Sequence, residues 1–147
     1  MTRVVHVTSQ AGRLPLSRRR IAGLADRVLH AEGVRSAELS IAFVTGPAIA
    51  RLNARHLGRR GLTDVIAFPF ARADGSPVVG DVYIAPAVAR VNARRNGVPV
   101  REELARLVVH GTLHVLGYDH PDGEERTASR MWRRQEALLE RALGGSS

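Results

Sequence analysis

Apolar residues recur along the chain with two different periods, which predict an alternation of strands and helices. Residues 38–44 place Leu39, Ile41 and Phe43 on one side of an extended chain, which is the period of a strand. Residues 18–31 instead repeat their apolar positions every three or four residues, which is the period of a helix. The pattern as a whole predicts strands over residues 4–8, 38–44, 63–70 and 78–84. It predicts helices over residues 17–31, 86–96 and 99–116, a short helix that begins at residue 45 or 46, and a last helix from about residue 125 to residue 143.

Residues that favour turns and helix ends separate these segments. Ser17 is a good N-cap for the first helix, and Gly97 follows the predicted end of the helix of residues 86–96. The short loop of residues 71–77 contains Asp74-Gly75 and predicts an antiparallel pair between the strands on either side. Pro69 cannot donate a hydrogen bond to a neighbouring strand, so the strand that contains it is expected at an edge of the sheet.

The segment of residues 99–116 is apolar around most of its circumference. A helix of this kind is buried, because no face of it is suited to water. We therefore expect it to form the centre of the core. The apolar positions are Leu104, Leu107, Val108, Val109, Leu113, Val115 and Leu116.

Composition is that of one globular domain. The 147 residues are 44% hydrophobic, and we expect a single domain over residues 1–143 followed by a disordered tail over residues 144–147. The first seven residues do not read as a signal peptide, and no apolar run is long enough to cross a bilayer, so a soluble cytoplasmic protein is expected. Cysteine is absent. A bound metal would therefore need nitrogen or oxygen ligands.

The chain is strongly basic, with a net charge of +8 and a pI of about 11.5. A polyanion such as nucleic acid is the natural partner for such a charge. Lysine is absent, and a GC-rich genome that favours arginine codons accounts for much of this. Arg51 and Arg55 lie one helical turn apart, with Arg59 and Arg60 just beyond. This arginine series is either a track for phosphates or a solvated helix face.

Three histidines form the most specific signal in the sequence. Residues 110–120 read HGTLHVLGYDH. The spacing of His110 and His114 places both rings on one face of a helix, and Gly117 offers a left-handed stop that can bring back His120. Three nitrogen ligands that leave a fourth position open are typical of a catalytic zinc. The prediction is one zinc ion per chain on these three residues.

The spacing of these histidines is that of the metzincin proteases, with one difference. The glutamate that follows the first histidine in those enzymes, where it acts as the general base, is Gly111 here. A zinc peptidase or amide hydrolase is therefore disfavoured as a function, although the ligand spacing is intact.

The histidine segment resembles the signature of the YbeY family, bacterial rRNA-maturation factors with a zincin-like metal site. Two further segments resemble family patterns in the same order along the chain. These are Leu52-Asn53 followed by residues 63–70 (TDVIAFPF), and residues 80–84 (GDVYI). Together the similar segments span most of residues 40–143.

This resemblance implies a single-domain α+β fold in which a helix is set against a four-stranded mixed sheet. It implies zinc on the three histidines and a single-strand-specific endoribonuclease that acts in small-subunit rRNA maturation and ribosome quality control. The implied partners are rRNA and the small ribosomal subunit, without DNA or a membrane. It is left open whether a ribosomal protein or an assembly GTPase takes part. An rRNA-binding assembly factor with a mainly structural zinc site remains the alternative.

The arginine that the family pattern places after Leu-Asn is absent from its position. That position is Leu57 here, and the flanking Arg59 and Arg55 are the candidates to stabilise charge on the scissile phosphate. Asp119 is the nearest carboxylate to the histidines in sequence. It is predicted either to orient a ligand or accept a proton, or to be a turn residue at the end of the helix. Asp64 and Asp81 are alternatives if their strands face the site.

Overall fold

The computed structural model describes residues 2–58, 63–118 and 130–144. All predicted strands and helices are present with bounds close to those expected, except that the predicted start of the last helix lies outside the described residues. Residues 145–147 of the predicted tail also lie outside them. The elements in order are β1 (Arg3–Ser9), α1 (Arg18–Ala31), β2 (Ala37–Phe43), α2 (Gly46–Leu57), β3 (Val65–Pro69), β4 (Val78–Ile84), α3 (Pro86–Asn96), α4 (Val100–Val115) and α5 (Arg130–Gly144).

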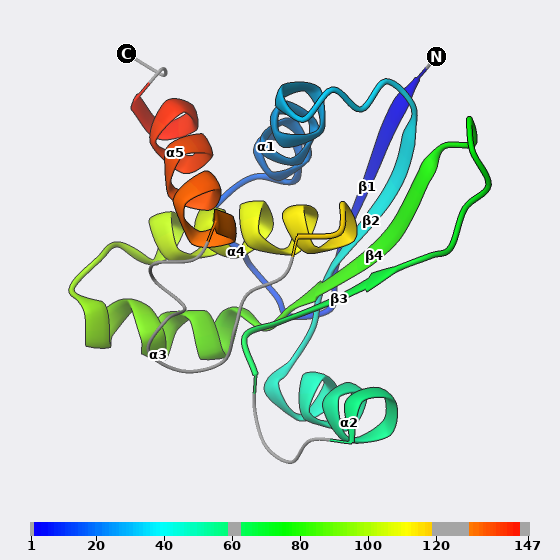
Figure 1. Ribbon diagram of the computed structural model, residues 1–147. Helices are drawn as coiled ribbons and strands as arrows, with labels where there is room; N and C mark the ends of the chain where they lie inside the picture. The colour runs from blue at the N-terminus through cyan, green and yellow to red at the C-terminus, as the bar shows by residue number, and fades with distance from the viewer. Residues whose placement is uncertain (1, 59–62, 119–129, 145–147) are drawn as a thin grey trace.

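The strands form one mixed sheet in the order β1-β2-β4-β3 (Figure 1). The pairs β1–β2 and β2–β4 are parallel, whereas β3 and β4 form the predicted antiparallel pair. The edge strand β3 ends at Pro69, as the sequence predicted. The mixed sheet and the surrounding helices confirm the α+β fold.

Side-chain caps fix where two of the helices begin. The hydroxyl oxygen of Ser17 accepts a hydrogen bond from the backbone N–H of Arg20 at 3.1 Å, at the start of α1. The hydroxyl oxygen of Thr45 likewise accepts a hydrogen bond from the backbone N–H of Ala48 at 3.2 Å, at the start of α2. Each cap satisfies a backbone donor that has no partner within the helix. The short polar residues therefore set where the chain leaves β2 and enters α2.

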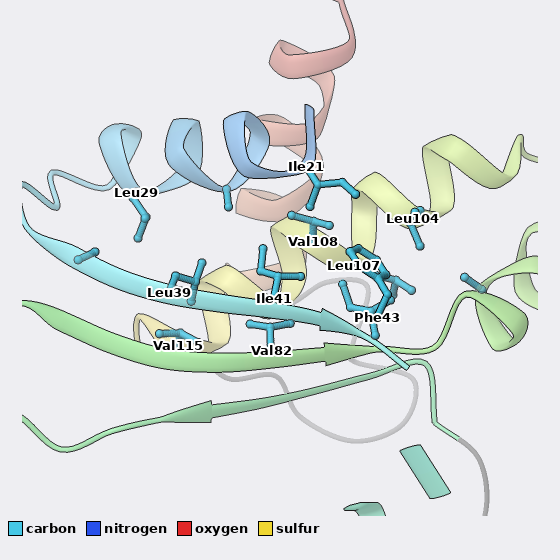
Figure 2. Packing of buried hydrophobic residues seen from close by; sticks show 14 of the residues in the cluster. Ile21, Leu29, Leu39, Ile41, Phe43, Val82, Leu104, Leu107, Val108 and Val115 are labelled. Carbon is cyan, nitrogen blue, oxygen red and sulfur yellow. The ribbon is translucent and has the colours of Figure 1, made fainter. Parts of the chain in front are cut away.

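Helix α4 lies between the sheet and α5. Figure 2 shows α1 and α4 against one face of the sheet, with Leu39 and Ile41 of β2 between them. Met131 and Leu139 of α5 pack on the outer side of α4 with Leu113. The predicted burial of the central helix is therefore confirmed. No helix in the described ranges is long and apolar enough to cross a membrane.

Helix α2 packs on the opposite face of the sheet. Ile49 and Leu52 of α2 pack with Ile66 and Phe68 of β3 and with Tyr83 of β4. Helices α1 and α4 pack on the first face. The histidines of α4 are thus separated from α2 by the sheet.

Candidate metal centre and the adjoining cavity

His110 and His114 project from the last two turns of α4. Their ring centroids are 4.6 Å apart and their planes meet at 78°. Both side chains are half-buried, while most of their neighbours on the helix are fully buried. The predicted proximity of the two rings is confirmed, and the buried helix holds them on a rigid support.

At Gly111, α4 lies in close contact with the sheet. A Cβ atom at this position would lie 2.5 Å from Cγ1 of Val82 and 3.4 Å from Cγ2 of Val65. Val82 is 1% exposed, so its side chain has little room to move aside. Glycine therefore lets the histidine helix lie directly on β4. This packing requirement gives a physical reason for the missing protease glutamate.

A buried side-chain amide on α5 forms a hydrogen bond with the ring of His110. Nδ1 of His110 and Oε1 of Gln135 are 2.5 Å apart, and Gln135 is 1% exposed. The amide nitrogen of Gln135 donates to Oε2 of Glu136 at 3.0 Å, which directs the amide oxygen to the histidine. The proton in the His110–Gln135 bond therefore lies on Nδ1. This tautomer leaves Nε2 with its lone pair, as a metal ligand requires.

Glu136 is in turn fixed by Arg106 of α4. The guanidinium of Arg106 donates to both carboxylate oxygens of Glu136, at 3.0 and 3.1 Å, and to Glu103 at 3.3 Å. Burial alone would lower the pKa of Arg106, but the hydrogen bonds and charges of Glu136 and Glu103 raise it above its usual value. Arg106 is thus permanently charged and already engaged by carboxylates, which makes it a poor candidate for a phosphate contact.

The two histidines fit a zinc ion in their chemistry. Neutral imidazole nitrogens are favoured zinc ligands, and an outer hydrogen bond to the second ring nitrogen is typical of such ligands. The third predicted ligand, His120, lies outside the described residues. Within the described ranges no group of three potential metal ligands occurs. The described residues thus supply two members of the predicted set.

The predicted catalytic residues lie mostly outside the part of the chain that the structure describes. Arg59 and Asp119 are both among the residues left out of it. Arg55 is exposed in the last turn of α2. Gly117, predicted to end the histidine helix, has a φ of +98° and donates to the carbonyl of His114 at 3.0 Å. This left-handed turn confirms the predicted end of α4.

The structure separates the two alternative carboxylates. Gly80 and Val82 of β4 contact α4, so Asp81 between them lies on the opposite face of the sheet. The condition under which Asp81 was an alternative, that its side chain faces the histidines, is therefore not met. Asp64 lies just before β3, lines a cavity together with His110, and accepts a hydrogen bond from Nδ2 of Asn92 at 3.1 Å. Of the two alternatives, Asp64 is therefore the one with access to the site.

The cavity beside His110 has a volume of about 450 Å³ and lies between α3, α4, α5 and the start of β3. Trp132 of α5, which the sequence analysis did not assign to the site, is half-buried and lines this cavity. Sequence reasoning also missed Gln135, although a signal was present. Gln135 is the polar member of the apolar stripe that begins at Met131 and ends at Leu139, so a buried polar contact was to be expected there.

Replacing Gln135 with leucine is expected to weaken zinc binding about 10- to 100-fold, because His110 then loses the acceptor that fixes its tautomer. The change keeps the side-chain volume, so the melting temperature should shift little. Zinc affinity can be measured by competition with a chromophoric chelator. Gln135→Glu retains an acceptor for Nδ1–H and serves as the control. Equal affinities for the parent and the leucine variant would show that Gln135 does not orient His110.

Comparisons with known proteins agree with one another. A family model described as Endoribonuclease YbeY matches residues 6–143. The chain is 37% identical to an Endoribonuclease YbeY of Frankia casuarinae, over 92% of the chain and 72% of that protein. It is 35% identical to one of Geobacter sulfurreducens, over 92% of the chain and 95% of that protein. It also resembles the solution structure of TM1509 from Thermotoga maritima, with a TM-score of 0.65, 23% identity, and coverage of 97% of the chain and 91% of that protein.

Proposed function

The chain belongs to the YbeY family of endoribonucleases, and on this premise we propose that it is a zinc-dependent endoribonuclease specific for single-stranded RNA. The observation that carries the zinc dependence is the pair of rings at 4.6 Å on α4, one of them oriented by Gln135. The net charge of +8 supports a polyanionic substrate.

His110, His114 and His120 are the residues that would hold the zinc. The chemistry that zinc supplies in such a site is polarisation of a phosphoryl oxygen and acidification of water to a pKa of about 7. Gln135 keeps His110 in the tautomer that can bind a metal, and the sheet and α5 shield α4 from solvent on either side. The protein thus supplies a rigid pair of ligands that needs little rearrangement during reaction.

An arginine and a carboxylate complete the proposed machinery. Arg59 would stabilise the negative charge that grows on the phosphate in the transition state. Arg55, the other candidate, is the weaker one because it lies on α2, across the sheet from the histidines. Asp119, or Asp64 from the cavity beside His110, would take up a proton or orient the attacking water. Asp64 is already held by Asn92, which limits the positions that its carboxylate can adopt.

The proposed substrate is rRNA of the small ribosomal subunit, and the proposed role is its maturation and quality control in the cytoplasm. The support for this role is the family resemblance of the histidine, Leu-Asn and TDVIAFPF segments. A ribosomal protein and an assembly GTPase are the partners to test. The conclusion about RNA cleavage does not depend on them.

Purified protein without a histidine tag tests the proposed activity on labelled RNA hairpins with unpaired loops. We expect cuts in the loops, none in the duplex stems, and none in DNA of the same sequence. Removal of metal by a chelator should stop cleavage, and added zinc should restore it. Cleavage that persists at full rate in metal-free protein would overturn the zinc dependence. Cuts within duplex stems would overturn the single-strand specificity.

A further inference from the structure

The cavity beside His110 has a lining that suits a flat, neutral and polar group. The indole of Trp132 supplies an aromatic surface, and Asn92 and Asn96 supply amide donors and acceptors. Asp64 adds a carboxylate that accepts hydrogen bonds. The volume of about 450 Å³ falls within the range of sites for small organic groups.

The charges that line the cavity argue against a phosphate in it. Its one cation, among the described lining residues, is Arg106, and that guanidinium is already bonded to Glu136, Glu103 and Glu102. The carboxylates of Asp64 and Glu103 face the same space and would repel an anion. An occupant is therefore expected to be uncharged and to present hydrogen-bond donors to Asp64.

We propose that this cavity receives one unpaired nucleobase of the RNA, stacked on Trp132 and with an exocyclic amino group directed to Asp64. The proposal rests on the proposed function, because it assigns a base-recognition subsite to the same nuclease. Proteins commonly read single-stranded RNA by stacking splayed bases on aromatic rings and bonding their polar edges. Adenine, cytosine and guanine carry such an amino group, whereas uracil does not.

The position of the cavity gives this subsite a role in choosing the cleavage site. His110 lines the cavity and is also a candidate zinc ligand, so a base seated there lies next to the reacting phosphate. An unpaired nucleotide can turn its base into such a space most easily, because a base in a duplex must first be unstacked and unpaired. The subsite would therefore favour single strands and disfavour uridine at one position.

Trp132 is the only tryptophan in the chain, so its fluorescence reports directly on this cavity. The parent protein is titrated with 2′-O-methyl hexaribonucleotides of adenine, cytosine or uracil, and with an abasic hexamer of the same charge. We expect saturable quenching by the adenine and cytosine oligomers. Binding of the abasic oligomer is expected to be about 5-fold weaker or more, because stacking on an aromatic ring contributes about 1–3 kcal/mol per base. The uracil oligomer still stacks but has no amino group to donate to Asp64, so it is expected to bind more weakly than the adenine oligomer.

Variants test the same site with a fluorescently labelled oligomer. Trp132→Ala should weaken binding of the adenine oligomer to the level of the abasic one, whereas Trp132→Phe should retain most of the affinity. Asn96→Ala should reduce the preference for adenine over uracil. Val91 lies on α3 with Asn96 but is exposed and does not line the cavity, so Val91→Ala should leave binding unchanged.

Two outcomes keep this inference distinct from the proposed function. If RNA is cleaved but base-bearing and abasic oligomers bind alike without quenching Trp132, the base subsite is wrong and the nuclease stands. If base-dependent quenching occurs without any cleavage, the base subsite is supported and the nuclease is overturned. Preferential binding of free phosphate in the cavity would also overturn the base subsite.

Discussion

Replacing His114 with alanine is expected to lower RNA cleavage at least about 100-fold, while the melting temperature and RNA affinity stay close to those of the parent. Loss of an outer hydrogen-bond partner alone costs about 10- to 100-fold at a metal site, and loss of a ligand should cost more. His114 is half-buried on α4, and alanine is the most favourable helix residue. RNA affinity should persist because it depends on arginines at other positions.

His114 is chosen rather than His110 because replacing His110 would also remove its bond to Gln135, which joins α4 to α5. Zinc content is measured by mass spectrometry on protein purified without a histidine tag, together with cleavage, RNA affinity and thermal unfolding. We expect about one zinc per parent chain and a loss of most of it in the variant. His6→Ala, on the exposed side of β1, is the matched control and should behave as the parent.

The alternative of an RNA-binding assembly factor with structural zinc makes a different prediction for the same variant. A metal that braces the fold would leave His114→Ala globally unfolded, and the parent would show no cleavage to lose. A parent that binds no zinc, even after the ion is supplied and the excess removed, would contradict both accounts. A basic RNA-binding protein without a metal centre would then remain.

Replacing Gly111 with glutamate is expected to destabilise the protein by about 3 kcal/mol or more. Its Cβ would overlap Val82, and overpacking in a buried region costs about 1–3 kcal/mol. Gly111 is itself buried, so the added carboxylate would also have to enter a region without a prepared partner, at a cost of about 3–5 kcal/mol when a charge is left uncompensated. Denaturant unfolding of parent and variant measures the difference.

Smaller changes separate the steric part of this effect from the charge. Gly111→Ala should cost about 1 kcal/mol, because the higher helix propensity of alanine offsets about 1 kcal/mol of the overpacking. Combining it with Val82→Ala should recover part of both losses, since each change makes room for the other. Strictly additive losses would show that Gly111 and Val82 do not contact in solution. A stable Gly111→Glu variant with peptidase activity would show that the site can act as a metzincin-like peptidase, which contradicts the steric account of Gly111.

Local sequence signals placed most of the elements, because caps and periodicity act over a few residues. Ser17, Thr45 and Gly117 mark helix ends through bonds to their immediate neighbours. The pair β3–β4 followed from its short loop, whereas the parallel pairs join strands that are distant in sequence and came from the family resemblance.

The parts of the site that were missed depend on tertiary contacts. Whether Asp81 or its neighbours face α4 could not be decided from β4, because Val79 and Tyr83 on one side are as apolar as Val82 on the other. Gln135 reaches His110 across the packing of α4 and α5, a contact that no local pattern specifies. The position of Trp132 at the cavity depends on the same packing.

The sheet order β1-β2-β4-β3 implies a sequence of events in folding. The β3–β4 hairpin closes the shortest loop and can form on a microsecond timescale, whereas the parallel pairs must first close much longer loops. Because β4 lies between β2 and β3, the hairpin is expected to add to β2 as a preformed unit. Helix α4 makes its main sheet contacts with β3 and β4, so it can dock on the hairpin once that has formed. The histidine pair is therefore expected to reach its place with the hairpin, and zinc binding by a nascent chain should follow the docking of α4 rather than the pairing of β1 with β2.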